Sequence, residues 1–438
     1  MMPPLNTFDK TLISIALAQA TLVSHAATIT VSENCSLADA IRSANQSTSI
    51  GTCTAGTGGV NTIELPADEI ITLSAIALDG DLFSPGGLPV VESNITIQGN
   101  GATIERDSGV GTPAFRLFGV SGYSATLTLN SITLQNGLAA NDPGSGGYGG
   151  AIYFSSGADV FINDSTLSGN SSEGYGGAIY GYSAHILEIN RSELSNNSTA
   201  YKGGAISSSF RTSAPTAGLK IYNSLLSHNV AGDGYPGGAI SLYGGLVNVI
   251  ANSTVSKNTA AGGGGIYLNA GELEMINATV SNNINTGYAG SLAVAGNSEY
   301  PPQVSLLNTV IANGSNNVDC SSNYSLTVTA TASWVENIES GCTGGGAVPA
   351  GITEGDPKLG PLANNGGTTK AQAPQLDSGL LGAGDATICA DPPINGIDQL
   401  MVARGVSSCT IGAMETGVDD DATFVVPLRS GGGVTFTL

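Results

Sequence analysis

Short runs in which apolar and polar residues alternate recur through the middle of the chain, from residue 124 to 316. Two examples are Ile-Leu-Glu-Ile at 186–189 and Leu-Glu-Met-Ile at 273–276. A two-residue period is typical of β-strands, whose successive side chains point to opposite faces of a sheet. Clusters of Gly, Ser, Asn and Asp separate the runs and indicate turns. The pattern predicts many short strands joined by tight turns.

Two phrases repeat within this region. Gly-Gly-Ala-Ile occurs at 149–152, 176–179, 203–206 and 237–240, with the variants Gly264-Gly265-Ile266 and Ala289-Gly290-Ser291-Leu292. An apolar residue followed by Ser, a variable residue and Asn occurs five times, ending at Asn170, Asn197, Asn229, Asn258 and Asn283. These asparagines are 27, 32, 29 and 25 residues apart. A period in this range without a helical pattern predicts a solenoid.

Stacked coils would align equivalent apolar residues into two buried ladders. One holds Ile152, Ile179, Ile206, Ile240, Ile266 and Leu292, and the other Leu167, Leu194, Leu226, Val255 and Val280. Each buried rung contributes about 1.5–3 kcal/mol. The asparagines suit turns with left-handed backbone geometry, and their stacked amides can hydrogen-bond from coil to coil. The predicted fold is all-β, a right-handed parallel β-helix over residues 88–316.

The paired phrases also resemble the repeats of polymorphic outer-membrane proteins, a group of bacterial surface adhesins. Those proteins favour Phe where this chain has Leu or Val in the second phrase. The resemblance implies a role in adhesion at a cell surface.

The N-terminal part of the chain divides into two predicted regions. Residues 1–26 hold Lys10, an apolar run and Ser24-His25-Ala26, which is typical of a signal peptide. Residues 27–87 form a predicted cap region with a short helix beginning at Ser36 and capped by it. The segment from Cys35 resembles the Cys-Ser-Leu-Arg-Glu-Ala motif at the start of many secreted bacterial β-helix proteins, and departs from it at 38–39.

The C-terminal part, 317–416, changes in character and resembles the choice-of-anchor Q domain. The resemblance rests on 356–369, 383–385, Asp398-Gln399 and 409–415, and departs at 400–401, where the family has Arg-Gly. It implies a closing segment that is joined to diverse surface anchors in that family. The tail, 417–438, predicts two short strands around a glycine turn.

Composition and net charge exclude some classes of binding partner. Charged residues make up 11% of the chain, 62 of 438 residues are Gly, and the formal net charge is −21. This acidity argues against nucleic acid as a partner. It also argues against tight binding of polyanionic glycans, unless a local basic patch or a bridging cation intervenes. No later apolar run reaches the length of a membrane-spanning helix.

The six cysteines pair naturally with their neighbours in sequence. Cys35–Cys53, Cys320–Cys342 and Cys389–Cys409 each enclose about twenty residues. In an exported chain these predict three disulfides, each worth about 2–4 kcal/mol. A metal site is the rival interpretation, but the chain lacks Cys-x-x-Cys and keeps two histidines after processing. We therefore predict no metal and no cofactor.

Catalysis on a β-helix needs converging charges. Calcium-dependent lyases use clustered carboxylates with a base, and inverting glycosidases use a carboxylate pair. Glu188 and Glu274 occupy similar strand positions, with Lys220 and Asn248 on the coils between them, and Arg191 can pair locally. No dense acid cluster emerges, so no catalytic residue is assigned. His185 and His228, with no Ser/Asp arrangement around them, are expected to be hydrogen-bonded surface residues.

Tyrosines recur with the repeat and form the candidate ligand-binding set. One group precedes the glycine pair, at Tyr148, Tyr175, Tyr201, Tyr235 and Tyr288, and another follows the inward isoleucine, at Tyr153, Tyr180 and Tyr267. Alternation places the second group outward. Stacked coils would turn both groups into aromatic stripes able to receive sugar rings or a partner protein. The alternative interpretation is a tyrosine ladder that only stiffens the surface.

The sequence thus favours an exported or cell-surface protein with a non-catalytic adhesion or binding role, toward an extracellular glycan or a surface protein. The alternative is a polysaccharide lyase or glycoside hydrolase, which rests on fold analogy alone. A third possibility is a structural envelope component. Ligand identity, surface attachment and oligomeric state stay open.

Overall fold

The computed structural model describes residues 26–77, 85–140, 146–210, 214–244, 248–287, 290–296, 301–315, 318–323, 326–339, 342 and 347–416, with the backbone of 424–427 and 433–436. The predicted signal peptide, apart from Ala26, and Tyr288 lie outside these residues.

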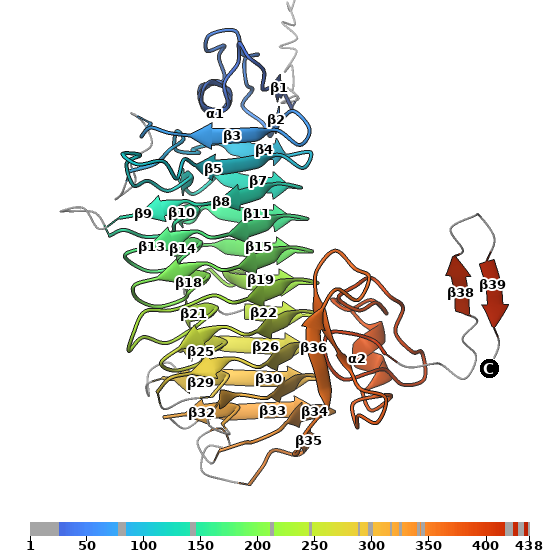
Figure 1. Cartoon of the computed structure of the whole chain (residues 1–438). Helices are drawn as coiled ribbons and strands as arrows, with labels where there is room; N and C mark the ends of the chain where they lie inside the picture. The colour runs from blue at the N-terminus through green and yellow to red at the C-terminus, as the bar shows by residue number, and fades with distance from the viewer. Residues whose placement is uncertain are drawn as a thin grey trace, which may run out of the picture.

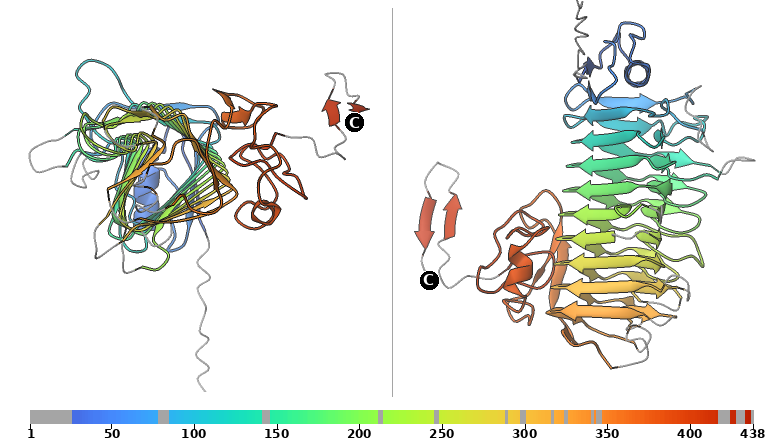
Figure 2. Two further views of the ribbon diagram at one scale, coloured as in Figure 1. Left: turned by 90° about the horizontal axis from the view of Figure 1, so that it is seen from below. Right: turned by 180° about the vertical axis from the view of Figure 1, so that it is seen from behind.

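The described chain winds into a parallel β-helix with three walls (Figure 1). Seen along its axis, the stack has a roughly triangular outline (Figure 2). The first sheet comprises β1 (Thr28–Thr30), β2 (Asn61–Glu64), β4 (Asn94–Gln98), β7 (Thr126–Asn130), β11 (Asp159–Asn163), β15 (Ile186–Asn190), β19 (Gly218–Tyr222), β22 (Asn248–Ala251), β26 (Glu272–Ile276), β30 (Gln303–Leu307) and β33 (Thr327–Thr331).

The second sheet comprises β3 (Ile70–Leu73), β5 (Thr103–Arg106), β8 (Thr133–Gln135), β12 (Thr166–Ser168), β16 (Glu193–Ser195), β20 (Leu225–Ser227), β23 (Thr254–Ser256), β27 (Thr279–Ser281), β31 (Val310–Ala312), β34 (Ser333–Val335) and β35 (Ile352–Thr353). The third comprises β6 (Phe118–Ser121), β10 (Ile152–Ser155), β14 (Ile179–Ala184), β18 (Ile206–Phe210), β21 (Ile240–Tyr243), β25 (Ile266–Asn269), β29 (Leu292–Ala295) and β32 (Cys320–Ser322). The three sheets therefore run from Thr28 to Thr353, beyond the predicted limits of 88–316.

Short paired strands at the corner between the second and third sheets complete several coils. They are β9 (Leu138–Ala139), β13 (Ser171–Ser172), β17 (Ser198–Thr199), β24 (Thr259–Ala260) and β28 (Ile284–Asn285).

Both predicted apolar ladders are confirmed. Ile152 pairs in register with Ile179, and the series continues to Leu292 without interruption. The second ladder runs in register from Leu167 to Val280. Every rung is fully buried. The core is thus one continuous apolar column, to which each coil contributes equivalent positions.

The predicted asparagine ladder is also present. Nδ2 of each asparagine donates to Oδ1 of the next, at 3.1 Å from Asn170 to Asn197 and at 2.9–3.0 Å along the rest of the series to Asn283. The predicted left-handed geometry falls one residue earlier, because Asn196, His228 and Lys257 carry the positive φ angles. The ladder asparagines point inward from the turn, where their amides bond to neighbouring coils.

The predicted helix α1 (Leu37–Gln46) is present at the N-terminal end of the stack (Figure 1). Its cap is Ser36, whose Oγ accepts a hydrogen bond from N of Asp39 at 3.1 Å. Leu37, Ile41 and Ala44 are buried in the same core as the first coils. The helix therefore covers apolar surface that the first coil would otherwise expose.

The C-terminal segment turns back along the flank of the solenoid after β35 (Figure 2). It holds β36 (Leu359–Ala363), which pairs antiparallel with β37 (Ala371–Pro374), and the helix α2 (Ala386–Ala390). Farther on, β38 (Phe424–Pro427) and β39 (Gly433–Phe436) form an antiparallel hairpin, the two short strands predicted for the tail.

All three predicted disulfides form. Their Cα–Cα distances are 4.9 Å for Cys35–Cys53, 5.8 Å for Cys320–Cys342 and 6.6 Å for Cys389–Cys409, within the usual range. Neither helix in the described part of the chain has the length and apolar character needed to cross a bilayer.

Candidate functional site

The outward face of the third sheet is built from two columns of side chains in register. One column runs Tyr153, Tyr180, Ser207, Ser241, Tyr267, and the other runs Tyr182, Ser209, Tyr243, Asn269. The columns arise because the residues after the inward isoleucine alternate outward, inward and outward in every coil. Tyrosine and small polar residues are therefore interleaved along the solenoid axis.

The change from tyrosine to serine in two successive coils creates a groove. Tyr180 and Tyr267 lie three strands apart, or about 14 Å at the usual inter-strand spacing, and Ser207 and Ser241 lie between them. The groove has a volume of about 220 Å³. Its lining comprises Tyr175, Tyr180, Lys202, Ser207, Ser208, Ser209, Ser241, Leu242, Tyr243, Tyr267 and Asn269.

The floor of the groove carries polar side chains that make no hydrogen bond within the described chain. The side chains of Ser207, Ser209, Ser241 and Asn269 make no hydrogen bond with any described residue. Ser207 and Ser241 are nevertheless largely buried, because the tyrosines on either side rise above them. Hydroxyl and amide groups that make no hydrogen bond within the described chain can bond to a ligand or to ordered water.

The first predicted tyrosine group forms a ladder beside the groove. The ring centroids of Tyr148 and Tyr175 lie 5.6 Å apart, and the next two steps to Tyr201 and Tyr235 are 5.5 and 4.8 Å. Tyr180 joins this ladder, at 4.7 Å from Tyr148 and 5.7 Å from Tyr175. The two predicted groups therefore merge into one cluster instead of forming separate stripes, and Tyr175 and Tyr180 of this cluster also line the groove.

Tyr153 is not available to a ligand in this arrangement. Its side chain is buried, with 2% exposure, and the Arg116 guanidinium lies 4.7 Å from its ring centroid. Burial raises the pKa of Tyr153, Tyr175 and Tyr180, so all three phenols stay protonated at neutral pH. Tyr243, by contrast, is 49% exposed and can offer a ring face.

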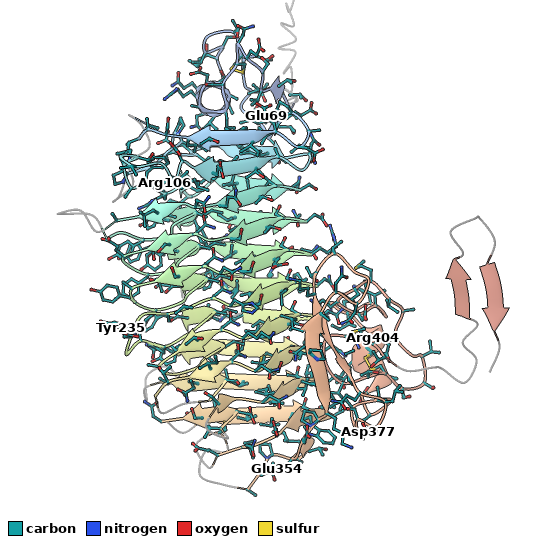
Figure 3. The ribbon with its side chains drawn as sticks, in the orientation of Figure 1. Glu69, Arg106, Tyr235, Glu354, Asp377 and Arg404 are labelled. Atoms are coloured by element: carbon teal, nitrogen blue, oxygen red, sulfur yellow. A yellow bond between two sulfur atoms is a disulfide. The ribbon has the colours of Figure 1, made fainter. Side chains whose placement is uncertain are left out.

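Figure 3 shows where the tyrosine ladder lies relative to the C-terminal segment. Tyr235, in the tyrosine ladder, projects from one edge of the molecule, whereas Arg404 lies in the C-terminal segment on the opposite side. The segment therefore leaves the tyrosine edge uncovered.

The charged residues considered for catalysis spread over the outward face of the first sheet. Lys220 Nζ lies 3.9 Å from Glu188 Oε2, but Val249, not Asn248, occupies the register between Lys220 and Glu274. Asn248 is buried instead. Burial, and then the charge of Glu272, raises the pKa of Glu274. Arg191 turns to the corner and pairs with Asp164 at 2.6 Å, so these residues do not converge on one groove.

His185 belongs to a hydrogen-bonded chain that the sequence analysis missed. Its Nδ1 lies 2.8 Å from Asp159 Oδ1 and its Nε2 lies 2.9 Å from Thr216 Oγ1. The expectation that no Asp surrounds His185 is therefore wrong, although the expected hydrogen-bonded state is correct. The overlooked signal was spacing, since Asp159 begins β11, and His185 and Thr216 lie just before β15 and β19 in the next two coils. Asp159 also accepts from N of Ile186 at 3.0 Å, so the chain joins neighbouring coils.

His228 occupies one of the corner turns described above. Burial lowers its pKa, and the charges of Lys257 and Lys370 lower it further. Across the described residues, no group of three or more His, Cys, Asp or Glu side chains is arranged to hold a metal ion.

No known protein family matches the chain, and none of the curated proteins or solved structures compared with it gives a match. The three family resemblances therefore rest on their sequence motifs alone.

Proposed function

We propose that this chain is an exported, non-catalytic binding protein, and that the groove on its third sheet holds an extracellular glycan. The observation that carries the proposal is the combination of exposed tyrosine with unused polar groups. Tyr243 offers an aromatic face, and Ser207, Ser209, Ser241 and Asn269 offer hydrogen-bonding groups beside it. Sugar rings carry apolar faces and hydroxyl edges, which match such a surface.

The size of the groove favours a glycan over a protein partner. Its volume of about 220 Å³ is below the usual range for a pocket that encloses a drug-sized ligand. A ligand would therefore be only partly enclosed, as expected for a chain that continues beyond the groove. Stable protein interfaces bury about 800 Å² on each partner around apolar anchors, whereas this floor is made largely of serine.

Export is supported by the three disulfides, which persist in oxidising compartments. The predicted signal peptide at 1–26 and the motifs that resemble those of secreted bacterial β-helix proteins and the choice-of-anchor Q domain point the same way. The repeats that resemble those of polymorphic outer-membrane proteins support a place at the cell surface.

The test is retention of the purified protein on immobilised polysaccharides, measured for two groove variants. Tyr243→Ala removes the exposed ring, and we expect it to weaken binding by about 3–10-fold. Ser241→Tyr continues the aromatic column and fills the groove, so we expect it to abolish binding while leaving the core intact. Tyr123→Ala is the matched control, because Tyr123 is exposed after β6, four strands from β21.

Two outcomes would reject the proposal. One is the absence of retention on every neutral and acidic polysaccharide tested. The other is release of new reducing ends or unsaturated sugars during the incubation, which would favour the lyase or hydrolase alternative. In that case Glu188, Arg191, Lys220 and Glu274 would be substituted first.

A further inference from the structure

The groove contains one cationic group, the side chain of Lys202, within a protein of net charge −21. Its Nζ lies 5.6 Å from the ring centroid of Tyr267. A cation over an aromatic face is held by the ring quadrupole, and this contact keeps the ammonium at the rim. Lys202 makes no ion pair with any described residue, unlike Lys220 and Lys358, which face Glu188 and Asp377.

An ammonium without a carboxylate partner, next to unused hydroxyls, favours a ligand that carries its own anion. The overall acidity limits how many anions that ligand can carry. A polyanionic glycan would place each additional charge near a surface that repels it, whereas a single carboxylate at Lys202 gains one attractive contact. Repulsion by the acidic surface and attraction by Lys202 together favour a glycan of low charge density.

We infer that the groove selects a largely neutral glycan that carries isolated uronic acid units, with the uronate carboxylate paired to Lys202. The inference rests on the proposed glycan-binding function and adds the class of sugar and the residue that recognises it. Tyr243 would contact a ring face, and the serine floor would contact the sugar hydroxyls.

The experiment compares two pairs of glycans, and the members of each pair differ in one carboxylate. Cellohexaose and cellohexaose oxidised at one C6 to a glucuronate would be titrated calorimetrically into the full-length protein, followed by xylohexaose with and without one glucuronic acid branch. We expect the acidic member to bind about 3–5-fold more tightly at about 50 mM salt. The advantage is expected to fall below about 2-fold at about 500 mM salt, because the ion pair is screened.

Lys202→Met keeps most of the side chain's length over Tyr267 but removes its charge. We expect this variant to lose the preference and to bind the neutral and acidic members with equal affinity. Lys358→Met is the control, because Lys358 lies on the C-terminal segment and pairs with Asp377. It should keep the preference for the acidic glycan.

The outcomes separate this inference from the function on which it rests. Equal binding of both members by the wild-type protein overturns the role of Lys202 and leaves glycan binding in place. If Lys202→Met loses binding to both the neutral and the acidic glycan, the proposed role of Lys202 is also overturned. The lysine would then support the structure of the groove rather than select a charge. Failure of every hexamer to bind the wild-type protein overturns the inference, and retention on the immobilised polysaccharides then decides separately whether the protein binds glycans.

Discussion

Buried amides at one corner hold successive coils together. Oδ1 of Asn229 accepts from both N and Nδ2 of Asn197 at 3.0 Å. Its Nδ2 donates to O of Leu194 and to Oδ1 of Asn258, each at 2.9 Å. The side chain is fully buried, so water cannot replace these bonds if the amide is removed.

Asn229→Ala is therefore expected to destabilise the protein by about 2–4 kcal/mol, since it leaves several buried donors and acceptors unpaired. Urea unfolding followed by circular dichroism measures the change. Asn196→Gly is the matched control: Asn196 is exposed at the neighbouring corner position with φ of 56°, which glycine adopts readily. A loss in Asn196→Gly as large as that in Asn229→Ala would contradict this account of the ladder.

Glu274 shows the opposite situation, a charge held where it is unfavourable. Its pKa is raised by burial and then by Glu272, so ionisation favours the unfolded chain. The stability that protonated Glu274 contributes is fully present below the pKa of Glu274 in the unfolded chain. It is lost as the pH rises through the pKa of Glu274 in the folded protein. Glu274→Gln should therefore stabilise the protein at pH 7 by less than about 1 kcal/mol.

The stabilisation by Glu274→Gln should vanish near pH 3, where Glu274 is protonated in both states. Thermal unfolding at the two pH values measures it. Glu188→Gln is the control and should bring no gain at pH 7, because Glu188 faces Lys220. A stabilisation by Glu274→Gln that persists at low pH would show that charge is not its cause.

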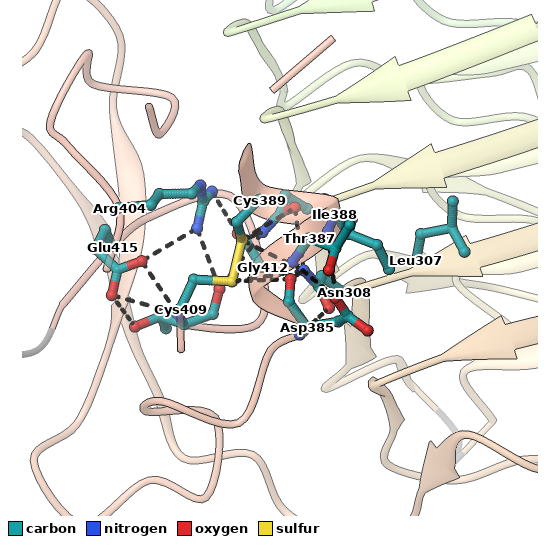
Figure 4. Close-up of a disulfide and its surroundings, with 12 residues drawn as sticks. Leu307, Asn308, Asp385, Thr387, Ile388, Cys389, Arg404, Cys409, Gly412 and Glu415 are labelled. Atoms are coloured by element: carbon teal, nitrogen blue, oxygen red, sulfur yellow. Dashed lines mark hydrogen bonds and ion pairs between the residues drawn. A yellow bond between two sulfur atoms is a disulfide. The ribbon is translucent and has the colours of Figure 1, made fainter. Parts of the chain in front are cut away.

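At the scale of elements, the C-terminal segment docks on the corner between the first and second sheets. Three corner asparagines, one per coil, receive it: Asn252, Asn277 and Asn308. Oδ1 of Asn308 accepts from N of Asp385 at 2.8 Å, and its Nδ2 donates to O of Asp385 at 3.0 Å, beside the Cys389–Cys409 disulfide (Figure 4). The segment therefore contacts equivalent corner positions in three coils of the solenoid.

Apolar residues strengthen this contact on both sides of the corner. Val249, Ala251 and Ile276 on the first sheet pack against Ile394, and Val310 and Ala312 on the second pack against Leu380 and Ile411. Strands that face solvent, such as β15, alternate between buried and partly exposed residues, whereas β22 and β31 are buried throughout. Loss of alternation in these strands was the sequence signal for a covering element.

Arg404 is the buried centre of the docked segment. Its Nη2 donates to O of Gly412 at 2.9 Å, and its Nη1 lies 3.5 Å from Oε2 of Glu415 (Figure 4). Nη2 also donates to Oδ1 of Asn252 at 2.8 Å. Burial lowers its pKa to about 10, which still leaves the guanidinium charged at neutral pH. Asp398, also buried, accepts from N of Glu415 at 2.9 Å and completes the network.

Arg404→Met is expected to destabilise this network by about 3–5 kcal/mol, because buried acceptors and the Glu415 carboxylate lose their partner. Detachment of the segment should appear as faster amide exchange at 385–413 and at the corner asparagines, with the apolar ladders still protected. The half-exposed Arg191, paired with Asp164, supplies the control Arg191→Met, which should leave the exchange at 385–413 unchanged. Uniform loss of protection in Arg404→Met would instead mean that segment and solenoid unfold as one unit.

At the scale of the whole molecule, two sides of one solenoid differ in what covers them. The chain's own C-terminal segment covers the corner of the first and second sheets. Apolar outward-facing residues at that corner pack against the segment. Tyr235, on the tyrosine edge, lies on the side opposite this cover (Figure 3), and the third-sheet groove is lined by residues between 175 and 269, outside the C-terminal segment. A binding surface on the uncovered side is therefore compatible with a closing segment that stabilises the other side.

The sequence alone determined the features that repeat or that form locally. The two apolar ladders, the asparagine ladder, the helix capped by Ser36 and the three disulfides follow from spacing, because a coil that repeats in register places equivalent residues above one another. Burial of an apolar position in one coil then predicts burial of its equivalent in the next.

Tertiary structure alone decided what covers each outward face and which side chains meet across the repeat. The docking of Arg404 on Asn252 joins residues 152 positions apart, and no period relates them. The burial of Tyr153, the bonds of His185 and the groove at Ser207 and Ser241 depend on neighbours in other coils and loops. The repeat fixes the inward positions because they share one core, whereas each outward position depends on the segment that lies over it.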